Sequence, residues 1–166
     1  MTCFFEYIEL GKVRFIGLEF DENTDINWLR PADSLLKIKP MLPEYGTEIT
    51  SLCCFTHHYG SEAHESQCNM MGYFFQADTP VPEGYDFYDV PTEHAAYAVY
   101  YSPNFDGNYY DPAYVCTRDQ ILGDNVCIPY PQSYWVAEVY IDGFCGEQFK
   151  KDSGAHHFGY LFSVEL

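Results

Sequence analysis

Glu138 is the residue whose surroundings in the sequence point most directly to chemistry. It lies between Tyr134 and Tyr140, in an apolar and aromatic stretch that predicts a strand over residues 134–141. Side chains alternate along a strand, so one face is expected to carry Tyr134, Val136, Glu138 and Tyr140. No Lys or Arg stands nearby in the sequence. Such a carboxylate costs free energy to bury unless hydrogen bonds or a cation match its charge. The alternative is an exposed strand glutamate.

Aromatic side chains are numerous enough to line a cleft around this carboxylate. The chain has 16 Tyr and 13 Phe residues. Tyrosine suits a partly hydrated cleft, because its ring is apolar and its hydroxyl can find a partner. In the other predicted strands, aromatic residues recur at alternate positions and so share a face. The candidate ligand-binding residues among them are Tyr73, Phe75, Tyr97, Tyr101 and Tyr160. Many of the remaining rings are expected to belong to the core.

Other residue clusters do not indicate a metal, a cofactor or a nucleophile. Neighbouring histidines such as His57 and His58 would point to opposite faces of a strand, and no pair has zinc-finger spacing. Residues 21–25 begin like a calcium-binding loop, but Ile26 stands where that loop needs glycine. There is no phosphate-binding loop and no dinucleotide fingerprint. We therefore expect no metal and no cofactor, and we assign no catalytic residue.

Two patterns recur in the same order at nearly the same separation. The pattern Asn-x-Asp-x-Asn-aromatic-x-x-Pro-Ala occupies residues 23–32 and 104–113, and Gly-Tyr-x-Phe occupies 72–75 and 159–162. They predict two repeats within one domain, 1–166: repeat one over about 1–80 and repeat two over about 91–166, joined by a linker at 80–91. The seam between such halves is expected to bury a shared core and to offer a ligand cleft.

Each repeat is expected to run strand–helix–strand–strand. Strands are predicted over 4–20 (one long or two short), 49–58, 70–76, 95–101, 134–141 and 158–166. A proline suits the first turn of a helix, which predicts helices from Pro31, ending before Pro40, and from Pro112, closed by Gly123. Residues 142–155 are expected to form a loop. We expect the helices to pack on the apolar face of the strand 134–141, which carries Trp135, Ala137, Val139 and Ile141.

Three segments resemble a known family in their order along the chain. They are residues 6–10 followed by 13–18, residues 90–91 followed by 94–101, and residues 135–140 with Glu138 and Tyr140. They are similar to the opening strands and the acidic strand of the GyrI-like small-molecule-binding domain family, the effector-binding domains of multidrug-sensing transcription regulators. The resemblance implies an α+β fold with tandem pseudo-two-fold strand–helix–strand–strand repeats, an antiparallel curved sheet, and helices on one face.

The resemblance also implies a function, which is to bind a small lipophilic or cationic organic molecule between the halves. Glu138 would match the charge of the ligand, and the surrounding rings would add cation–π contacts of roughly 0.5–2 kcal/mol each. The chain would then be a stand-alone binding protein. Two alternatives stay open. One is a hydrolase of strained-ring cytotoxic compounds with Glu138 as general base. The other is an acidic protein-binding modulator, similar to the gyrase-inhibitor branch of the family.

Charge and composition restrict the partners. The net charge is −17, and the eight Lys and Arg residues form no basic stripe, so nucleic acid is not expected as a direct partner. A protein partner would be reached through the acidic surface. No apolar run approaches the roughly 20 residues that span a bilayer, and no secretory leader is visible, so no membrane association is expected. The seven cysteines are therefore interpreted as thiols of a cytoplasmic protein, the alternative being a disulfide-bearing secreted domain.

Overall fold

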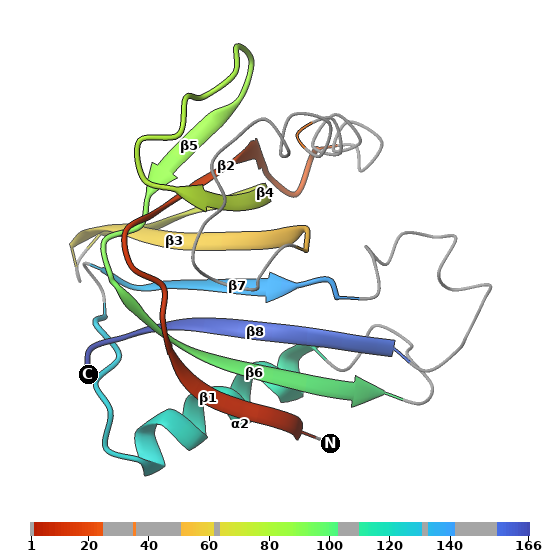
Figure 1. The fold of residues 1–166 in the computed structure, drawn as a ribbon, viewed down its shortest axis with the longest axis vertical. Helices are drawn as coiled ribbons and strands as arrows, with labels where there is room; N and C mark the ends of the chain where they lie inside the picture. Colours follow the sequence, from red (N-terminus) through yellow and green to blue (C-terminus); the bar gives the residue numbers. More distant parts are fainter. Residues whose placement is uncertain are drawn as a thin grey trace.

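Eight strands of the computed structural model form one antiparallel sheet, with helix α2 on one face (Figure 1). The structure describes residues 2–24, 35, 51–61, 64–102, 110–130, 133–141 and 156–166. The elements are β1 (Thr2–Glu9), β2 (Val13–Phe20), β3 (Cys53–Ser61), β4 (His64–Gln76), β5 (Asp86–Asp89), β6 (His94–Ser102), α2 (Tyr110–Gly123), β7 (Trp135–Val139) and β8 (His156–Val164). This arrangement confirms the α+β class with an antiparallel sheet. In the described part of the chain, no helix is both long and apolar enough to cross a membrane.

The strand order runs β1-β6-β8-β7-β3-β4-β2-β5. The central pair, β3 with β7, joins strands from the two predicted repeats. Outward from this pair lie β4, β2 and β5 on one side and β8, β6 and β1 on the other. A site at the seam between the predicted repeats would therefore lie on this central pair. The tandem repeat itself stays a prediction.

The predicted elements agree with the structure in most places. Residues 4–20 form two strands, β1 and β2, separated at 10–12. One strand, β5, was missed within the predicted linker at 80–91, where it pairs with β2. The helix predicted from Pro31 lies outside the described residues except for Leu35, which is helical and fully buried. The loop predicted at 142–155 also lies outside them.

Helix α2 begins at Tyr110, two residues before the predicted start at Pro112, and its left-handed capping residue is Asn125 instead of the predicted Gly123. Pro112 lies in the first turn. Gly123 is the last helical residue, and the left-handed residue that closes the helix is Asn125, with a φ of 59°. The amide of Val126 donates to the carbonyl of Ile121 (3.2 Å), and that of Asn125 donates to the carbonyl of Leu122 (3.1 Å). These two bonds form a Schellman cap, which asparagine tolerates almost as glycine does.

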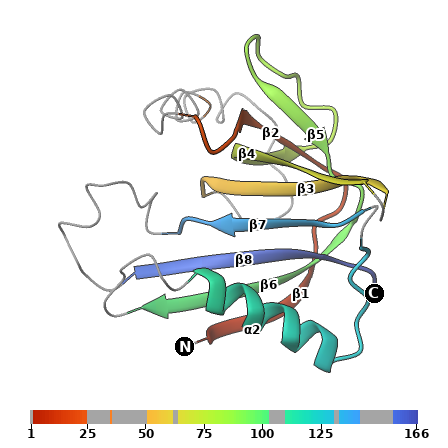
Figure 2. The ribbon, with the colours of Figure 1, turned by 180° about the vertical axis from the view of Figure 1, so that it is seen from behind.

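The two faces of the sheet bury different cores. Helix α2 covers β8 and β6 on one face, as Figure 2 shows, and packs Ala113 and Ile121 against them. The opposite face holds an aromatic core in which Phe55 stacks on Trp135 (5.4 Å between ring centroids) and on Phe15 (4.6 Å). The prediction that the Trp135 side of its strand packs on helices is wrong for the described residues. Alternation fixed which residues share a face, but the helix lies on the other face, the one that carries Glu138.

Candidate functional site

Glu138 lies on the central strand pair, on the face of the sheet that α2 covers. In β7 it stands opposite Cys54 of β3 and Tyr160 of β8. The hydroxyl of Tyr140 donates to Glu138 Oε2 (2.8 Å), and that of Tyr160 donates to Oε1 (3.0 Å). Both oxygens of the carboxylate are thus held by tyrosines, which stabilises its charge and fixes its orientation.

A pocket of about 280 Å³ opens over this carboxylate. Its described lining comes from three strands and the helix: Cys54, Thr56, Tyr114, Val136, Glu138 and Tyr160. Tyr114 projects from α2 and forms the wall opposite the sheet. The described lining thus combines a carboxylate, a thiol, hydroxyls and aromatic rings.

A larger pocket of about 600 Å³ continues from the first. The two share Thr56, Tyr114 and Val136. The further lining residues come from β3, β4, α2 and the segment before β7: His58, Gln67, Asn69, Arg118, Leu122, Ile128, Tyr130 and Tyr134. We call the smaller space the carboxylate compartment and the larger one the aromatic compartment. Their combined size is within the range of small-molecule sites.

Burial keeps the hydrogen-bonding groups of the site protonated at neutral pH. Burial, helped by the negative charge of Glu138, raises the pKa of the Cys54 thiol to about 12. Burial also raises the pKa of Tyr134, whose hydroxyl shares a 2.7 Å hydrogen bond with that of Tyr114. The thiol and the phenol are therefore neutral groups, and neither is a nucleophile at pH 7.

The structure brings some of the predicted ligand-binding residues together and separates others. Glu138, Tyr140 and Tyr160 form one hydrogen-bonded group, and Tyr134 lines the adjoining aromatic compartment. Tyr134 packs into the same core cluster as Tyr160, on the α2 side of the sheet.

The other four predicted residues line neither compartment. Tyr73 and Phe75 are on the α2 face but are buried in a separate cluster with Ile16 and Leu35. Tyr97 packs against the aromatic core on the opposite face. Tyr101 alternates with Tyr97 on that same face and contacts His157, with ring centroids 5.1 Å apart.

Residues that were not predicted to bind the ligand also line the two compartments. Tyr114 lies two positions after Pro112. The predicted helix start at that proline places Tyr114 in the first turn, but it does not show that the side chain faces the sheet. Thr56 and His58 follow Cys54 at alternate positions on β3 and so share the Glu138 face. The two neighbouring histidines do point apart, as predicted. His57 stacks on Tyr88 (3.9 Å), and His58 lies against Tyr134 (4.7 Å).

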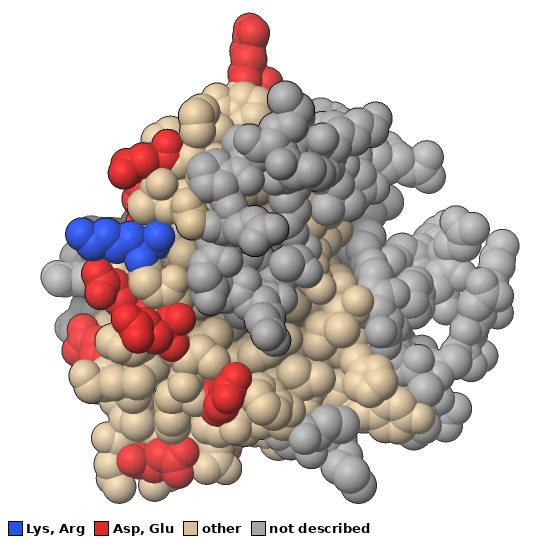
Figure 3. Space-filling model, in the orientation of Figure 1, with Lys and Arg blue, Asp and Glu red and all other residues tan. Residues whose placement is uncertain are grey.

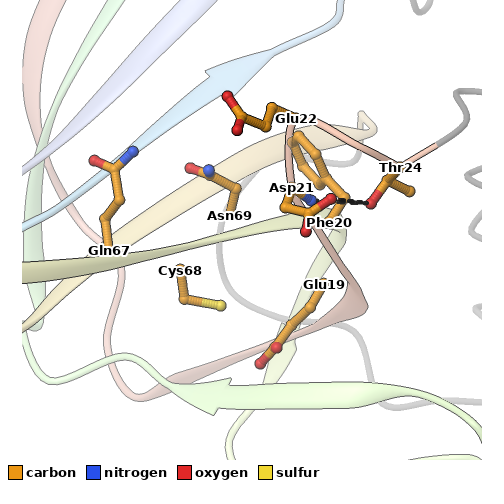
Figure 4. Close-up of a pocket in the computed structure, with 8 residues that line it drawn as sticks. All are labelled: Glu19, Phe20, Asp21, Glu22, Thr24, Gln67, Cys68 and Asn69. Atoms are coloured by element: carbon orange, nitrogen blue, oxygen red, sulfur yellow. Dashed lines mark hydrogen bonds between the residues drawn. The ribbon is translucent and has the colours of Figure 1, made fainter.

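A third pocket, of about 520 Å³, lies where β2 leads into the residues that follow it (Figure 4). Gln67 and Asn69 line both this pocket and the aromatic compartment. Figure 4 shows Cys68 and Glu19 on the opposite side of β4 from these two amides. The carboxylate of Asp21 accepts hydrogen bonds from residues close in sequence, namely from the amide of Asn23 and from the hydroxyl of Thr24.

Charged side chains are dispersed over the described part of the face that Figure 3 shows. On the face shown in Figure 3, acidic side chains are scattered among uncharged ones and outnumber the basic ones. Among the described residues, no group of three or more His, Cys, Asp or Glu is arranged to hold a metal ion. The described lining of the two compartments offers a carboxylate, a thiol, a guanidinium, hydroxyls, amides and rings.

Comparison with known proteins shows similarity only at the level of structure. No protein-family model and no curated protein matches the sequence. A protein from Staphylococcus aureus MU50 described as a bacterial transcription regulation protein has a similar structure, with a TM-score of 0.54 and 10% identity. That comparison covers 98% of this chain and 99% of the other.

Two further structures show the same fold. One is SAV2435 bound to tetraphenylphosphonium, with a TM-score of 0.55 and 11% identity over 98% of this chain and 94% of that one. The other is EcmrR in complex with DNA, with a TM-score of 0.54 and 20% identity. The latter match covers 98% of this chain but 57% of EcmrR. The chain therefore has the fold of these proteins.

Proposed function

We propose that this chain is a small-molecule-binding protein of the GyrI-like effector-binding type, whose ligand is a lipophilic organic cation seated over Glu138. The fold it shares with SAV2435, a protein solved with tetraphenylphosphonium, supports the class of ligand. The resemblance of the segments around residues 6–18, 90–101 and 135–140 to that family supports the same assignment.

The observation that carries the proposal is the carboxylate of Glu138 held by two tyrosine hydroxyls beneath a pocket. The bonds from Tyr140 and Tyr160 orient both oxygens without neutralising the charge. A cation that enters gains the attraction of a partly buried carboxylate and contact with the rings of Tyr114 and Tyr160. A permanent organic cation costs less to dehydrate than a small ion, so it suits such a site.

The proposal also includes the organisation of the chain as two repeats. Strand order supports it, because β7, β8 and β6 lie outward from the centre on one side in the same sequence as β3, β4 and β2 on the other. In this arrangement Cys54 and Glu138 are at matching places at the centre of the sheet. The ligand would sit where the two repeats meet.

Calorimetry with tetraphenylphosphonium tests the proposal. Replacement Glu138→Gln keeps the shape and removes the charge, so affinity should fall about 10- to 100-fold, which corresponds to roughly 1.5–3 kcal/mol for a charged contact. Triphenylphosphine oxide, a neutral ligand of related shape, should lose less. Glu6→Gln is the matched control, since Glu6 is exposed and pairs with Tyr97 on the opposite face. Unchanged affinity in a folded Glu138→Gln variant would overturn the proposal. Mass spectrometry of the ligand after incubation should recover it intact.

A further inference from the structure

We infer that the aromatic compartment is a subsite for an uncharged aromatic group belonging to the same ligand. The ligand would then be an elongated molecule with a cationic head over Glu138 and an aromatic tail beside Tyr130 and Tyr134. This inference rests on the proposed function for the head and adds a second recognition element to it.

The first support is continuity between the compartments. Thr56, Tyr114 and Val136 line both, so a molecule over Glu138 can extend past Tyr114 without leaving the protein surface. The aromatic compartment is about 600 Å³, roughly twice the 280 Å³ of the carboxylate compartment. The larger share of a bound molecule would therefore lie away from the carboxylate.

The second support is the chemistry of the wall. His58, Tyr130 and Tyr134 form a cluster of rings, with centroids 4.7 Å apart for His58 and Tyr134 and 5.5 Å apart for Tyr130 and Tyr134. The Tyr130 and Tyr134 rings meet at 66°, an edge-to-face arrangement. Leu122 and Ile128 supply aliphatic surface. Flat aromatic groups gain most from such a wall, through stacking as well as burial.

The third support is charge. Arg118 is the one Lys or Arg in the described lining of this compartment, and that part of the lining holds no carboxylate. The guanidinium of Arg118 donates to Asp119 Oδ1 through Nη2 (2.8 Å) and Nε (3.1 Å), so its charge is already matched. A described lining with a compensated cation and without a carboxylate suits an uncharged group, in contrast to the space over Glu138.

The fourth support is exposed apolar surface at the mouth. The side chains of Leu122 and Tyr130 are 55% and 54% exposed although both line the compartment. Exposed leucine beside aromatic residues at a concave site marks a place where binding removes apolar surface from water. The tail of the ligand would cover these two residues.

Two synthetic probes separate the tail from the head. Hexyltrimethylammonium carries a cationic head and an aliphatic chain, whereas 6-(2-naphthyloxy)hexyltrimethylammonium adds a ring system at the end of the same chain. The naphthyl probe should bind wild-type protein about tenfold more tightly, a gain typical of one well-packed aromatic contact. Tyr130→Ala and Leu122→Ala should each remove most of that gain and change binding of the hexyl probe less than about twofold.

Val115→Ala is the matched control, because Val115 is an exposed apolar residue of α2 (41%) that lines neither compartment. It should leave both affinities unchanged. All three positions are exposed, so the variants should fold, which circular dichroism can verify. Equal affinity of the two probes, or equal losses of both in Tyr130→Ala, would overturn the inference. Failure of the proposed function looks different: Glu138→Gln would then leave both probes unaffected.

Discussion

Cys54 of β3 lies directly opposite Glu138 of β7, on the strand pair at the centre of the sheet. Both side chains line the carboxylate compartment. Burial is the larger cause of the raised pKa of the thiol, about 12, and the charge of Glu138 adds to it. The reactivity of Cys54 is therefore a readout of the carboxylate beside it, available without knowledge of the ligand.

Alkylation of Cys54 by iodoacetamide should be slow at pH 8 and faster in Glu138→Gln. Removing the negative charge lowers the pKa of the thiol, and each unit of lowering gives about tenfold more thiolate far below the pKa. Because burial remains, we expect an increase of about two- to tenfold. The measurement is the time course of modification of the Cys54 peptide by mass spectrometry, with Cys53 replaced by alanine in both proteins.

The exposed thiol of Cys116 on α2 provides the internal reference for this experiment. It should be labelled rapidly and at the same rate with either residue at position 138. A bound tetraphenylphosphonium should slow labelling of Cys54 and not of Cys116. If Cys54 reacts no faster after Glu138→Gln, its protonation does not depend on the carboxylate.

Gly72→Ala should strongly destabilise the protein. Gly72 of β4 faces Gly17 of β2, and an added Cβ at position 72 would lie 2.0 Å from the carbonyl oxygen of Ile16 and 2.6 Å from the Cα of Gly17. These are backbone atoms of a paired strand and cannot move without breaking the pairing. We expect a loss of about 3 kcal/mol in the free energy of unfolding, at the upper end for overpacking, measured by urea denaturation.

Gly123→Ala is the matched control for the methyl group itself. Gly123 is the last residue of α2, and apart from its chain neighbours and the backbone of its own helix no heavy atom lies within 4 Å of its Cβ position. Alanine favours the helix, so the change should be neutral or stabilising by up to about 1 kcal/mol. A similar loss of stability from both glycines would show that the close approach of β2 and β4 is not the reason for Gly72.

Local pattern predicted what is local, and packing decided the rest. Alternation correctly placed Tyr134, Glu138 and Tyr140 on one face, because the two-residue period is a property of the strand itself. The face of the sheet that the helix covers was predicted wrongly, because the side on which a helix packs depends on how the chain crosses over the sheet. The strand β5 was not predicted, because it is short and has an aspartate at each end, Asp86 and Asp89, which is not typical of a strand. Its pairing with β2 makes it a strand.

The sequence predicted the carboxylate of the candidate site, but only some of the residues that line its two compartments. Tyr97 and Tyr101 were grouped with Glu138 because they alternate on one strand, but relative faces of different strands depend on register, and a shift of one residue reverses them. Tyr114 was absent from the prediction because the inner side of a helix is set by its docking. The resemblance to a family could give the strand that carries Glu138 but not these contacts.

Tyr100→Phe should weaken the attachment of α2 to the sheet. The Thr117 hydroxyl donates its proton to the Ala113 carbonyl (2.8 Å), so in its 2.7 Å bond with Tyr100 the tyrosine must be the donor. Phenylalanine leaves the buried Thr117 oxygen with one partner fewer, at a cost of about 1–2 kcal/mol. Urea denaturation measures the loss. In a Thr117→Val background, Tyr100→Phe should cost much less; additive losses would contradict a shared hydrogen bond.

Asp89→Asn should destabilise the protein slightly at pH 7 and progressively less as the pH falls below about 4. Arg14 binds Asp89 through Nε (2.6 Å) and Nη2 (3.0 Å), and this bonding lowers the pKa of the carboxyl. A carboxyl whose pKa is lowered on folding stabilises the folded state above its unfolded pKa, about 3.9, and loses that contribution as pH falls through the folded pKa. The Asp89 side chain is 61% exposed, so solvent screening limits the effect to about 0.5 kcal/mol. Thermal unfolding of both proteins from pH 7 to pH 3 should show melting temperatures that converge at low pH, and 1 M NaCl should narrow the gap at pH 7. A gap that widens toward pH 3 would mean that Asp89 is not stabilised as an anion by Arg14.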